Sequence, residues 1–595
     1  MKITRVFDLL ENYREKYYNK SDVLAGKEDG KWIYYNTSDY IEMSNLFSYG
    51  LLEIGFKKGD KIVTITNNRP EWNFIDMGML QVGVVNVPVY PTISKDDYYY
   101  ILDHAAPKAI IVSDKNLYER IKSVASMAGI ENIYTINRVE NAKNWLQIVD
   151  TGKQNIEKHK EELNKIKNEI KSDDIFTLIY TSGTTGFPKG VLLSHNNIIT
   201  NFVATAEVHS LGAESRALSF LPLNHIYERM LNYHYQYKGI SIYYAENLGT
   251  IVENLKEVKP HIFMAVPRIF ELLYDKIVSI GRDLPWIQQK IFFWTIKLGQ
   301  KFELSSHKSV FYNFKLLLAD KLVFYKWREA LGGNVKLSVS GGATLQLRLA
   351  KIFWAAGIPI IEGYGLTETS PVIAVDNPLK KEIMLGTVGP VLRDVSLKIA
   401  HDGEILCKGP NVMQGYYKQP ELTKEVIDNE GWFHTGDIGS LIDNKYLKIT
   451  DRKKEIFKLS SGKYIAPQVI ENKFKESVFI EQAMVLGENQ KFASALVQPN
   501  FPYLHKWCSF HKIYFHNNDD LICKQRVIEC YQKAINEINK LLGQTEQIKR
   551  FRLVADEWST QSGELSPTLK LRRRFIYEKY KDIIEQIYVQ NQAND

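Results

Sequence analysis

The 595-residue sequence has few cysteines, no long apolar run and no apolar stretch among its first residues, and each shortage argues against a class of protein. Its four cysteines lack any CxxC spacing, which argues against a zinc site and a disulfide framework. No apolar run approaches the ~18 residues that cross a bilayer, and the N-terminus is charged from the start. We therefore expect a cytoplasmic protein whose membrane contact, if it has any, is peripheral and at the inner face.

An excess of charge of one sign is also lacking. The formal net charge is only +7, which does not imply nucleic-acid binding, and no motif supports that function either. Hydrophobic residues make up 45% and charged residues 24%, which are ordinary values for a folded globular protein. The length exceeds what one hydrophobic core supports, so we expect at least two domains.

The pattern of apolar segments predicts an α/β protein. Residues 60–92 give a β-branched strand, a helical stretch and a second strand, which is typical of a parallel α/β layer. Further short buried strands are expected at residues 109–113, 175–180, 217–221, 240–244, 262–266 and 336–339.

Towards the C-terminus the pattern changes. Residues 390–450 are rich in short strands and glycine turns, and residues 465–500 and 551–585 form a small α/β unit of their own. We predict a large N-terminal domain, 1–450, made of α/β layers and a β-rich subdomain. A small mobile α/β C-terminal domain, 451–595, follows, with a hinge near 451–454.

The most informative segment is Tyr180–Gly190 (YTSGTTGFPKG), which follows an apolar strand and precedes a helical stretch near His195. Its glycines allow backbone N–H groups to converge on an anion. Its hydroxyl side chains and Lys189 add further donors, so the loop suits a polyphosphate. The spacing differs from a Walker A loop. The alternative is an ordinary glycine-rich turn.

This segment resembles the phosphate-binding signature of the adenylate-forming superfamily, which includes acyl-CoA synthetases, luciferases and peptide-synthetase adenylation domains. Other signatures of that family follow in order as far as residue 574, so the resemblance covers almost the whole chain. It implies ATP or AMP contacts for the loop residues Thr181, Ser182, Gly183, Thr184, Thr185, Gly186 and Lys189.

Two further motifs resemble the family's adenine and metal sites. In EGYGLTET, Tyr364 after Gly363 would stack on adenine, Thr367 would contact the phosphate or carboxylate during catalysis, and Glu368 would hold Mg²⁺ together with Thr184. A carboxylate is the hard oxygen ligand that Mg²⁺ prefers. In SGGA, Gly341 and Gly342 would line the adenine pocket, where glycine avoids a clash with the base.

The C-terminal motifs supply the remaining roles. The resemblance implies that Asp437 of HTGD binds the ribose hydroxyls, since a carboxylate suits a vicinal diol. In the same way, Lys570 is the catalytic lysine, stabilising negative charge as it builds during attack. In residues 451–467, Arg452 would contact ribose or phosphate, Lys454 is the hinge position, and Lys458 would approach the phosphate. The coenzyme A channel would involve Ser460, Ser461, Gly462 and Tyr464.

Together these motifs imply a ligase that uses ATP, Mg²⁺ and coenzyme A to convert an acid to acyl-AMP and then to a thioester. The hinge segment DRKKEIFKLSSGKYIAP and the ending LSPTLKLRR resemble the long-chain branch, so a long-chain fatty acid is the expected substrate. In LPLNHIYER, His225 is a candidate catalytic gate beside the acyl tunnel, or else a buried structural histidine.

Two other functions remain open. One is an acyl-AMP ligase that delivers its product to a carrier protein, and the other is a non-catalytic lipid-binding protein that has kept the fold. Residues 284–328 form a basic, aromatic-rich insertion, which is either a packed helical hairpin or a membrane-surface patch. A homodimer is compatible with the sequence, which does not set the oligomeric state.

Overall fold

The computed structural model describes residues 2–181, 188–304, 309–566 and 569–589. It confirms the predicted strand–helix–strand order, with β3 (Lys61–Ile65), α3 (Pro70–Val82) and β4 (Val85–Pro88). β3 and β4 are parallel neighbours. Helix α3 is buried along its whole length because it contacts β4 and also α2 (Thr37–Glu53).

These strands belong to an eight-stranded sheet with the order β18-β9-β8-β4-β3-β5-β6-β7. Its other members are β5 (Ala109–Val112), β6 (Ile133–Thr135), β7 (Lys143–Asn144), β8 (Ile175–Thr181), β9 (Lys189–Ser194) and β18 (Gly415–Tyr416). The strand that leads into the predicted phosphate loop, β8, therefore lies beside the N-terminal α/β layer.

A second eight-stranded sheet has the order β15-β14-β13-β12-β10-β11-β1-β2. Its strands β10, β12, β13 and β14 are parallel to one another, so their carboxyl ends share one edge. The members are β1 (Leu24–Glu28), β2 (Lys31–Tyr35), β10 (Arg216–Ser219), β11 (Ser241–Tyr244), β12 (Ile262–Ala265), β13 (Leu337–Ser340), β14 (Ile360–Gly365) and β15 (Val372–Val375).

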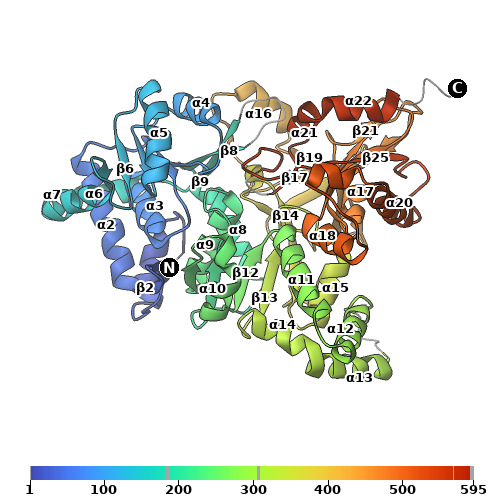
Figure 1. The fold of residues 1–595 in the computed structure, drawn as a ribbon. Coiled ribbons are helices and arrows are strands. Elements are labelled where there is room, and N and C mark those ends of the chain that lie inside the picture. The colour runs from blue at the N-terminus through green and yellow to red at the C-terminus, as the bar shows by residue number, and fades with distance from the viewer. Residues whose placement is uncertain (1, 182–187, 305–308, 567–568, 590–595) are drawn as a thin grey trace. The chain divides into compact units, whose positions relative to one another are not determined.

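Helix α9 (Ile226–Lys238) is an interior helix, with residues 226–236 all buried. It lies beside α8 (His195–Thr205) (Figure 1). Its Arg229 is fully enclosed, and the guanidinium donates to Asp76 of α3 and to Thr177 of β8, both at 2.6 Å. A buried charge is stable only with a charged or hydrogen-bonding partner. Here the partners of Arg229 lie on α3 and β8, so the bonds connect α9 to both elements.

The chain divides into two compact units. The N-terminal unit contains residues 1–398, 406–435 and 442–447, and the C-terminal unit contains residues 399–405, 436–441 and 448–595. The β-rich region expected at 390–450 is confirmed as a four-stranded sheet, β16-β17-β19-β20. Its strands are β16 (Ser396–Ile399), β17 (Glu404–Lys408), β19 (Phe433–Ile442) and β20 (Tyr446–Arg452). The hinge near 451–454 stays a prediction.

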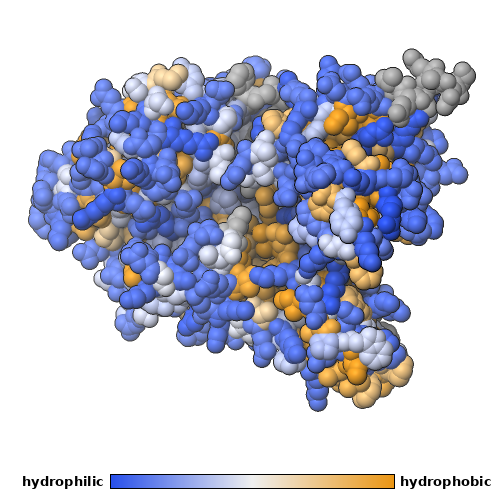
Figure 2. All heavy atoms as spheres, viewed as in Figure 1, coloured by the Kyte–Doolittle hydropathy of each residue, from blue (hydrophilic) through white to orange (hydrophobic). Residues whose placement is uncertain are grey.

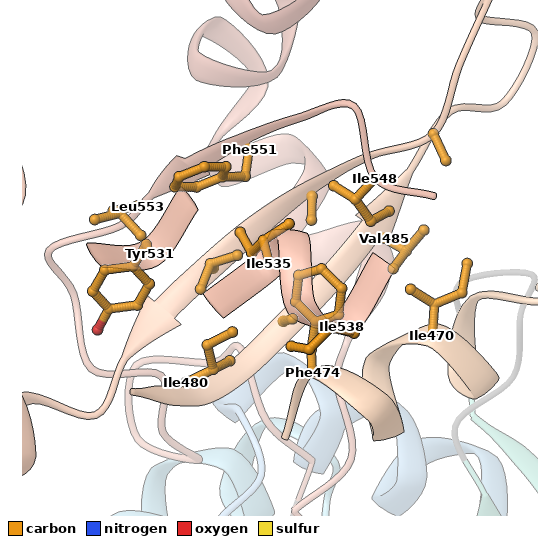
Figure 3. Packing of buried hydrophobic residues seen from close by; sticks show 14 of the residues in the cluster. Ile470, Phe474, Ile480, Val485, Tyr531, Ile535, Ile538, Ile548, Phe551 and Leu553 are labelled. Atoms are coloured by element: carbon orange, nitrogen blue, oxygen red, sulfur yellow. The ribbon is translucent and has the colours of Figure 1, made fainter. Parts of the chain in front are cut away.

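The small C-terminal α/β unit is also as expected. Strands β23 (Ile480–Leu486), β24 (Ser494–Pro499) and β25 (Arg550–Leu553) form a mixed sheet. Helices α17 (Pro467–Phe474) and α20 (Gln525–Asn539) share its hydrophobic core. In Figure 3, Phe474 of α17 and Ile538 of α20 lie next to each other in this core.

The insertion at 284–328 is helical. It contains α12 (Trp286–Gly299), α13 (Val310–Ala319), a π-helical turn (Asp320–Phe324) and the start of α14 (Tyr325–Ala330). Helix α12 packs against α15 (Leu347–Ala355) and buries five residues, whereas α13 buries only Ala319. Within the described ranges, no helix combines the length and apolar character that crossing a membrane requires.

Candidate active site

The predicted phosphate loop joins two antiparallel strands. In β8 and β9, Thr181 pairs with Lys189, so these two predicted phosphate contacts face each other across the hairpin. The sequence predicted a helix after the loop; α8 does begin at His195, but β9 precedes it. The other predicted loop residues lie outside the described ranges: Ser182, Gly183, Thr184, Thr185 and Gly186.

The two motifs predicted to line the adenine pocket meet at the carboxyl edge of the second sheet. Gly341 and Gly342 follow β13 directly, and β14 carries Gly363 and Tyr364. Because Ser340 of β13 pairs with Glu362 of β14, the two motifs are neighbours in space. Ligands of parallel α/β sheets bind outside such carboxyl ends.

Glycine is favoured to different degrees, and for different reasons, at the three glycine positions of this edge. A Cβ on Gly341 would lie 2.4 Å from the Tyr227 hydroxyl, so a side chain of this protein, rather than a base, already requires glycine here. Gly342 has a φ of +81°, which favours glycine. A Cβ on Gly363 would meet nothing closer than 3.5 Å. Among these three, Gly363 is the glycine that the fold itself does not demand.

Glu368 lies on a short 3-10 turn, Thr367–Thr369, directly after β14. Its carboxylate Oε1 accepts a hydrogen bond from the Tyr416 hydroxyl at 2.9 Å. Its carbonyl oxygen accepts the Met413 N–H at 2.8 Å. Thr367 is buried, while Glu368 and Tyr364 are half-buried. The predicted metal-binding acid is therefore held by side-chain and main-chain bonds.

Two buried carboxyl groups lie beneath this motif, and sequence reasoning gave neither a role. The Glu362 N–H donates to Asp376 Oδ2 at 3.0 Å. Burial, with a contribution from Asp376, raises the pKa of Glu362 to about 8, and burial raises the pKa of Asp376 to about 7. Charge repulsion thus disfavours ionising both groups together at neutral pH.

His225 caps the N-terminus of α9. Its Nδ1 accepts the Tyr227 N–H at 3.2 Å, and its half-buried ring lies 6.5 Å from that of Tyr90. This bond gives the histidine a capping task, although its ring is half-buried and not buried as the structural interpretation expected. The gate role stays a prediction.

Three predicted nucleotide contacts come together inside the C-terminal unit. Asp437 of β19 is buried, and its Oδ1 lies 3.4 Å from Nε of Arg452 at the end of β20. Lys570 interacts electrostatically with Arg452, Asp437 and Glu455. The residues predicted to contact ribose or phosphate, to bind the ribose hydroxyls and to act as the catalytic lysine thus share one neighbourhood.

The segment after β20 also carries the predicted hinge and coenzyme A residues. Lys454 is exposed, and its neighbour Lys453 bonds to Glu404 of β17 at 2.9 Å. Strands β21 (Phe457–Lys458) and β22 (Tyr464–Ile465) form a hairpin. The residues predicted to contact phosphate or coenzyme A are exposed on it: Lys458, Ser460, Ser461, Gly462 and Tyr464. Such a hairpin is open to a ligand.

Sequence reasoning missed Tyr416. It lies about fifty residues beyond the turn Thr367–Thr369 that carries Glu368, called the acidic turn below. Only the pairing of β18 with β9 brings it to the site. No local pattern around Gly415–Tyr416 distinguishes it from other strand tyrosines.

Comparison with known proteins gives the family. Residues 13–417 match the family described as AMP-binding enzyme, and residues 454–592 match its C-terminal domain. The long-chain-fatty-acid–CoA ligase FadD15 of Mycobacterium bovis is 31% identical, over 94% of this chain and 93% of that protein. Fatty acyl-CoA synthetase A of Dictyostelium discoideum is 30% identical, over 98% of this chain and 91% of that protein.

Among solved structures, the adenylation domain of a carboxylic acid reductase from Segniliparus rugosus, in complex with AMP and a carboxylic acid, has a similar fold. Its TM-score is 0.74 at 20% identity, over 98% of this chain and 94% of that one. This similarity agrees with the fold predicted from the motifs. The chain therefore belongs to the family of AMP-binding enzymes.

Proposed function

We propose that this chain is an AMP-forming long-chain fatty-acid–CoA ligase. It converts a fatty acid and ATP to acyl-AMP and pyrophosphate, and then transfers the acyl group to coenzyme A with release of AMP. The observation that carries the proposal is the match, over nearly the whole chain, to relatives named as long-chain fatty-acid–CoA ligases and fatty acyl-CoA synthetases.

In the first half-reaction, a carboxylate oxygen attacks the α-phosphorus of ATP, and the bond from that phosphorus to pyrophosphate breaks. Thr181 and Lys189 would hold the phosphates, Tyr364 the adenine, and Asp437 the ribose. Lys570 would stabilise the negative charge that builds during attack. No side-chain nucleophile is needed, and positioning supplies much of the rate.

Mg²⁺ fits the acidic turn, since Mg²⁺ commonly binds one or two protein carboxylates together with substrate phosphates. Glu368, with its carboxylate fixed by Tyr416, would hold the ion together with Thr184. When bound, Mg²⁺ would neutralise charge on the phosphates of ATP.

In the second half-reaction, the thiol of coenzyme A attacks the acyl carbon and AMP leaves. The exposed hairpin that carries Ser460, Ser461, Gly462 and Tyr464 would contact the pantetheine arm. The C-terminal domain, 451–595, would turn about the hinge near Lys454, so that Lys570 and this hairpin face the reacting carbon in turn.

A two-acceptor assay tests the function. The purified chain is given ATP, Mg²⁺ and palmitate, with either coenzyme A or a pantetheinylated carrier protein, and the thioester is measured. We expect palmitoyl-CoA. A thioester formed only on the carrier would favour the acyl-AMP ligase, and no ATP–pyrophosphate exchange would favour a non-catalytic protein.

We also propose a membrane partner for the insertion. Exposed apolar side chains form a stripe on α13 and the turn after it, at the helical spacing of residues 311, 314, 318, 322 and 325. Apolar atoms gather over α12 and α13 in Figure 2. The exposed set is Val310, Phe311, Phe314, Leu317, Leu318, Leu322 and Tyr325.

The charge around this stripe favours an anionic lipid surface. Residues 284–328 contain eight lysines and arginines against two acidic residues. Lys315 lies 4.0 Å from the Phe311 ring, and Lys290 of α12 lies 4.0 Å from the exposed Trp286 ring. Aromatic and basic side chains together suit the headgroup region of a membrane, here the cytoplasmic face.

Vesicle co-sedimentation tests this contact. We expect binding to vesicles with anionic lipid and loss of binding in the variant Phe311→Ser/Phe314→Ser. Phe510→Ser, at an even more exposed phenylalanine of the C-terminal unit, is the control. If the stripe variant instead converts a dimer to a monomer without affecting vesicle binding, a second copy of the chain covers the stripe.

A further inference from the structure

Tyr416 lies between two predicted nucleotide-binding segments, although it belongs to neither motif. Its hydroxyl donates to Oε1 of Glu368 at 2.9 Å. The face of its ring lies 5.3 Å from Nζ of Lys189. The side chain is only 7% exposed. One buried residue therefore contacts both the acidic turn and the lysine at the end of the phosphate loop.

The backbone fixes Tyr416 to the phosphate-loop hairpin. In the pairing of β18 with β9, Tyr416 lies opposite Val191, and the Tyr417 N–H donates to the Gly190 carbonyl oxygen at 2.8 Å. Lys189 begins β9, so the ring and the lysine belong to adjacent, hydrogen-bonded strands. Their contact thus depends on a sheet and not on a loop.

The same segment also holds the acidic turn by its main chain. The Met413 N–H donates to the Glu368 carbonyl oxygen at 2.8 Å, and the Asn411 side-chain amide donates to the Thr369 carbonyl oxygen at 3.1 Å. The turn that carries Glu368 is therefore clamped at two carbonyl oxygens and one carboxylate oxygen.

The hydrogen bond from Tyr416 engages only one of the two oxygens of Glu368. A bond to Oε1 restrains rotation of the carboxylate and leaves Oε2 to meet a cation.

We propose that Tyr416 is a positioning residue that orients Glu368 toward the Mg²⁺ of the ATP complex and supports Lys189 beside the phosphates. This inference rests on the proposed function and adds a residue to it. Residues that orient a metal ligand typically change metal affinity by about 10- to 100-fold when they are replaced.

The test measures metal binding directly. Mn²⁺ binding is followed by electron paramagnetic resonance with a non-hydrolysable ATP analogue, and AMP binding without metal is followed by calorimetry. We expect Tyr416→Phe to raise the Mn²⁺ dissociation constant about 10- to 100-fold and to leave AMP affinity unchanged. The Mg²⁺ concentration for half-maximal AMP release should rise equally, and kcat should recover at saturating Mg²⁺.

Tyr417→Phe is the matched control, because the Tyr417 ring instead contacts His104 and Lys61. Equal Mn²⁺ affinity in the two variants would overturn the role of Tyr416. A loss of AMP affinity equal to the loss of Mn²⁺ affinity would also overturn it, since that indicates general disruption of the site. If the unchanged protein binds no Mn²⁺–nucleotide complex, the proposed function fails and this inference fails with it.

Discussion

Replacing Arg229 by methionine should destabilise the N-terminal unit strongly. The guanidinium is completely buried, and it donates to Asp76, Thr177 and Tyr233. Removing one member of a buried ion pair costs about 3–5 kcal/mol because the other charge stays buried. Asp76 would keep its bonds from Tyr233 and Asn86, which places the expected loss near the lower end, at about 3 kcal/mol.

Urea unfolding followed by tryptophan fluorescence measures this loss, and Trp72, whose ring lies 5.2 Å from the guanidinium carbon, reports on the site. Arg393→Met is the matched control: its partner Glu207 is 46% exposed, so the cost should stay below about 1 kcal/mol. The double variant Asp76→Asn/Arg229→Met should lose less than the sum of its single variants. Equal losses for Arg229→Met and Arg393→Met would refute the reasoning.

Three further predictions follow from the C-terminal unit and the buried histidines. Lys570→Ala should abolish acyl-AMP formation but spare thioester synthesis from supplied acyl-AMP; equal loss of both half-reactions would contradict its role. Arg573→Met should cost about 3–5 kcal/mol of unfolding free energy because Glu471, which it pairs with, is buried; an unchanged urea midpoint would argue against this. Burial lowers the pKa of His195 to about 3 and that of His209 to about 4. The unfolded chain, with histidine pKa values near 6.5, therefore binds protons first as the pH falls. Stability is full above about pH 6.5 and should drop below it by up to about 1.4 kcal/mol per pH unit for each histidine. His209→Gln should reduce the slope of unfolding free energy against pH. An unaltered slope would show that His209 does not contribute to the pH dependence.

The fold could be predicted from local sequence because its strands are short β-branched runs and its helices follow them in order. The stretch 60–92 shows this, since strand, helix and strand were expected and β3, α3 and β4 are found there. The hairpin strand β9 was missed. Its residues, Lys189–Ser194, lie between a glycine loop and a helix, and only pairing with β8 makes them a strand.

Individual site residues were predicted from motifs, whereas their supports were not. The reason for glycine at Gly341 is Tyr227, more than a hundred residues away, and the support of Glu368 is Tyr416. Such contacts join segments that are distant in the chain, so no local spacing carries them. The paired carboxyls Glu362 and Asp376 likewise owe their pKa values to burial, which a single sequence does not show.

The central claim is long-chain acid activation with coenzyme A as acceptor. Its most direct measurement is coenzyme-A-dependent AMP release with MgATP across saturated acids from acetate to about C20, where each buried methylene is worth about 0.8 kcal/mol. We expect the rate to rise with chain length and to reach its maximum at about C12 or longer. A maximum at acetate, or at aromatic or amino acids included for comparison, would contradict the long-chain assignment.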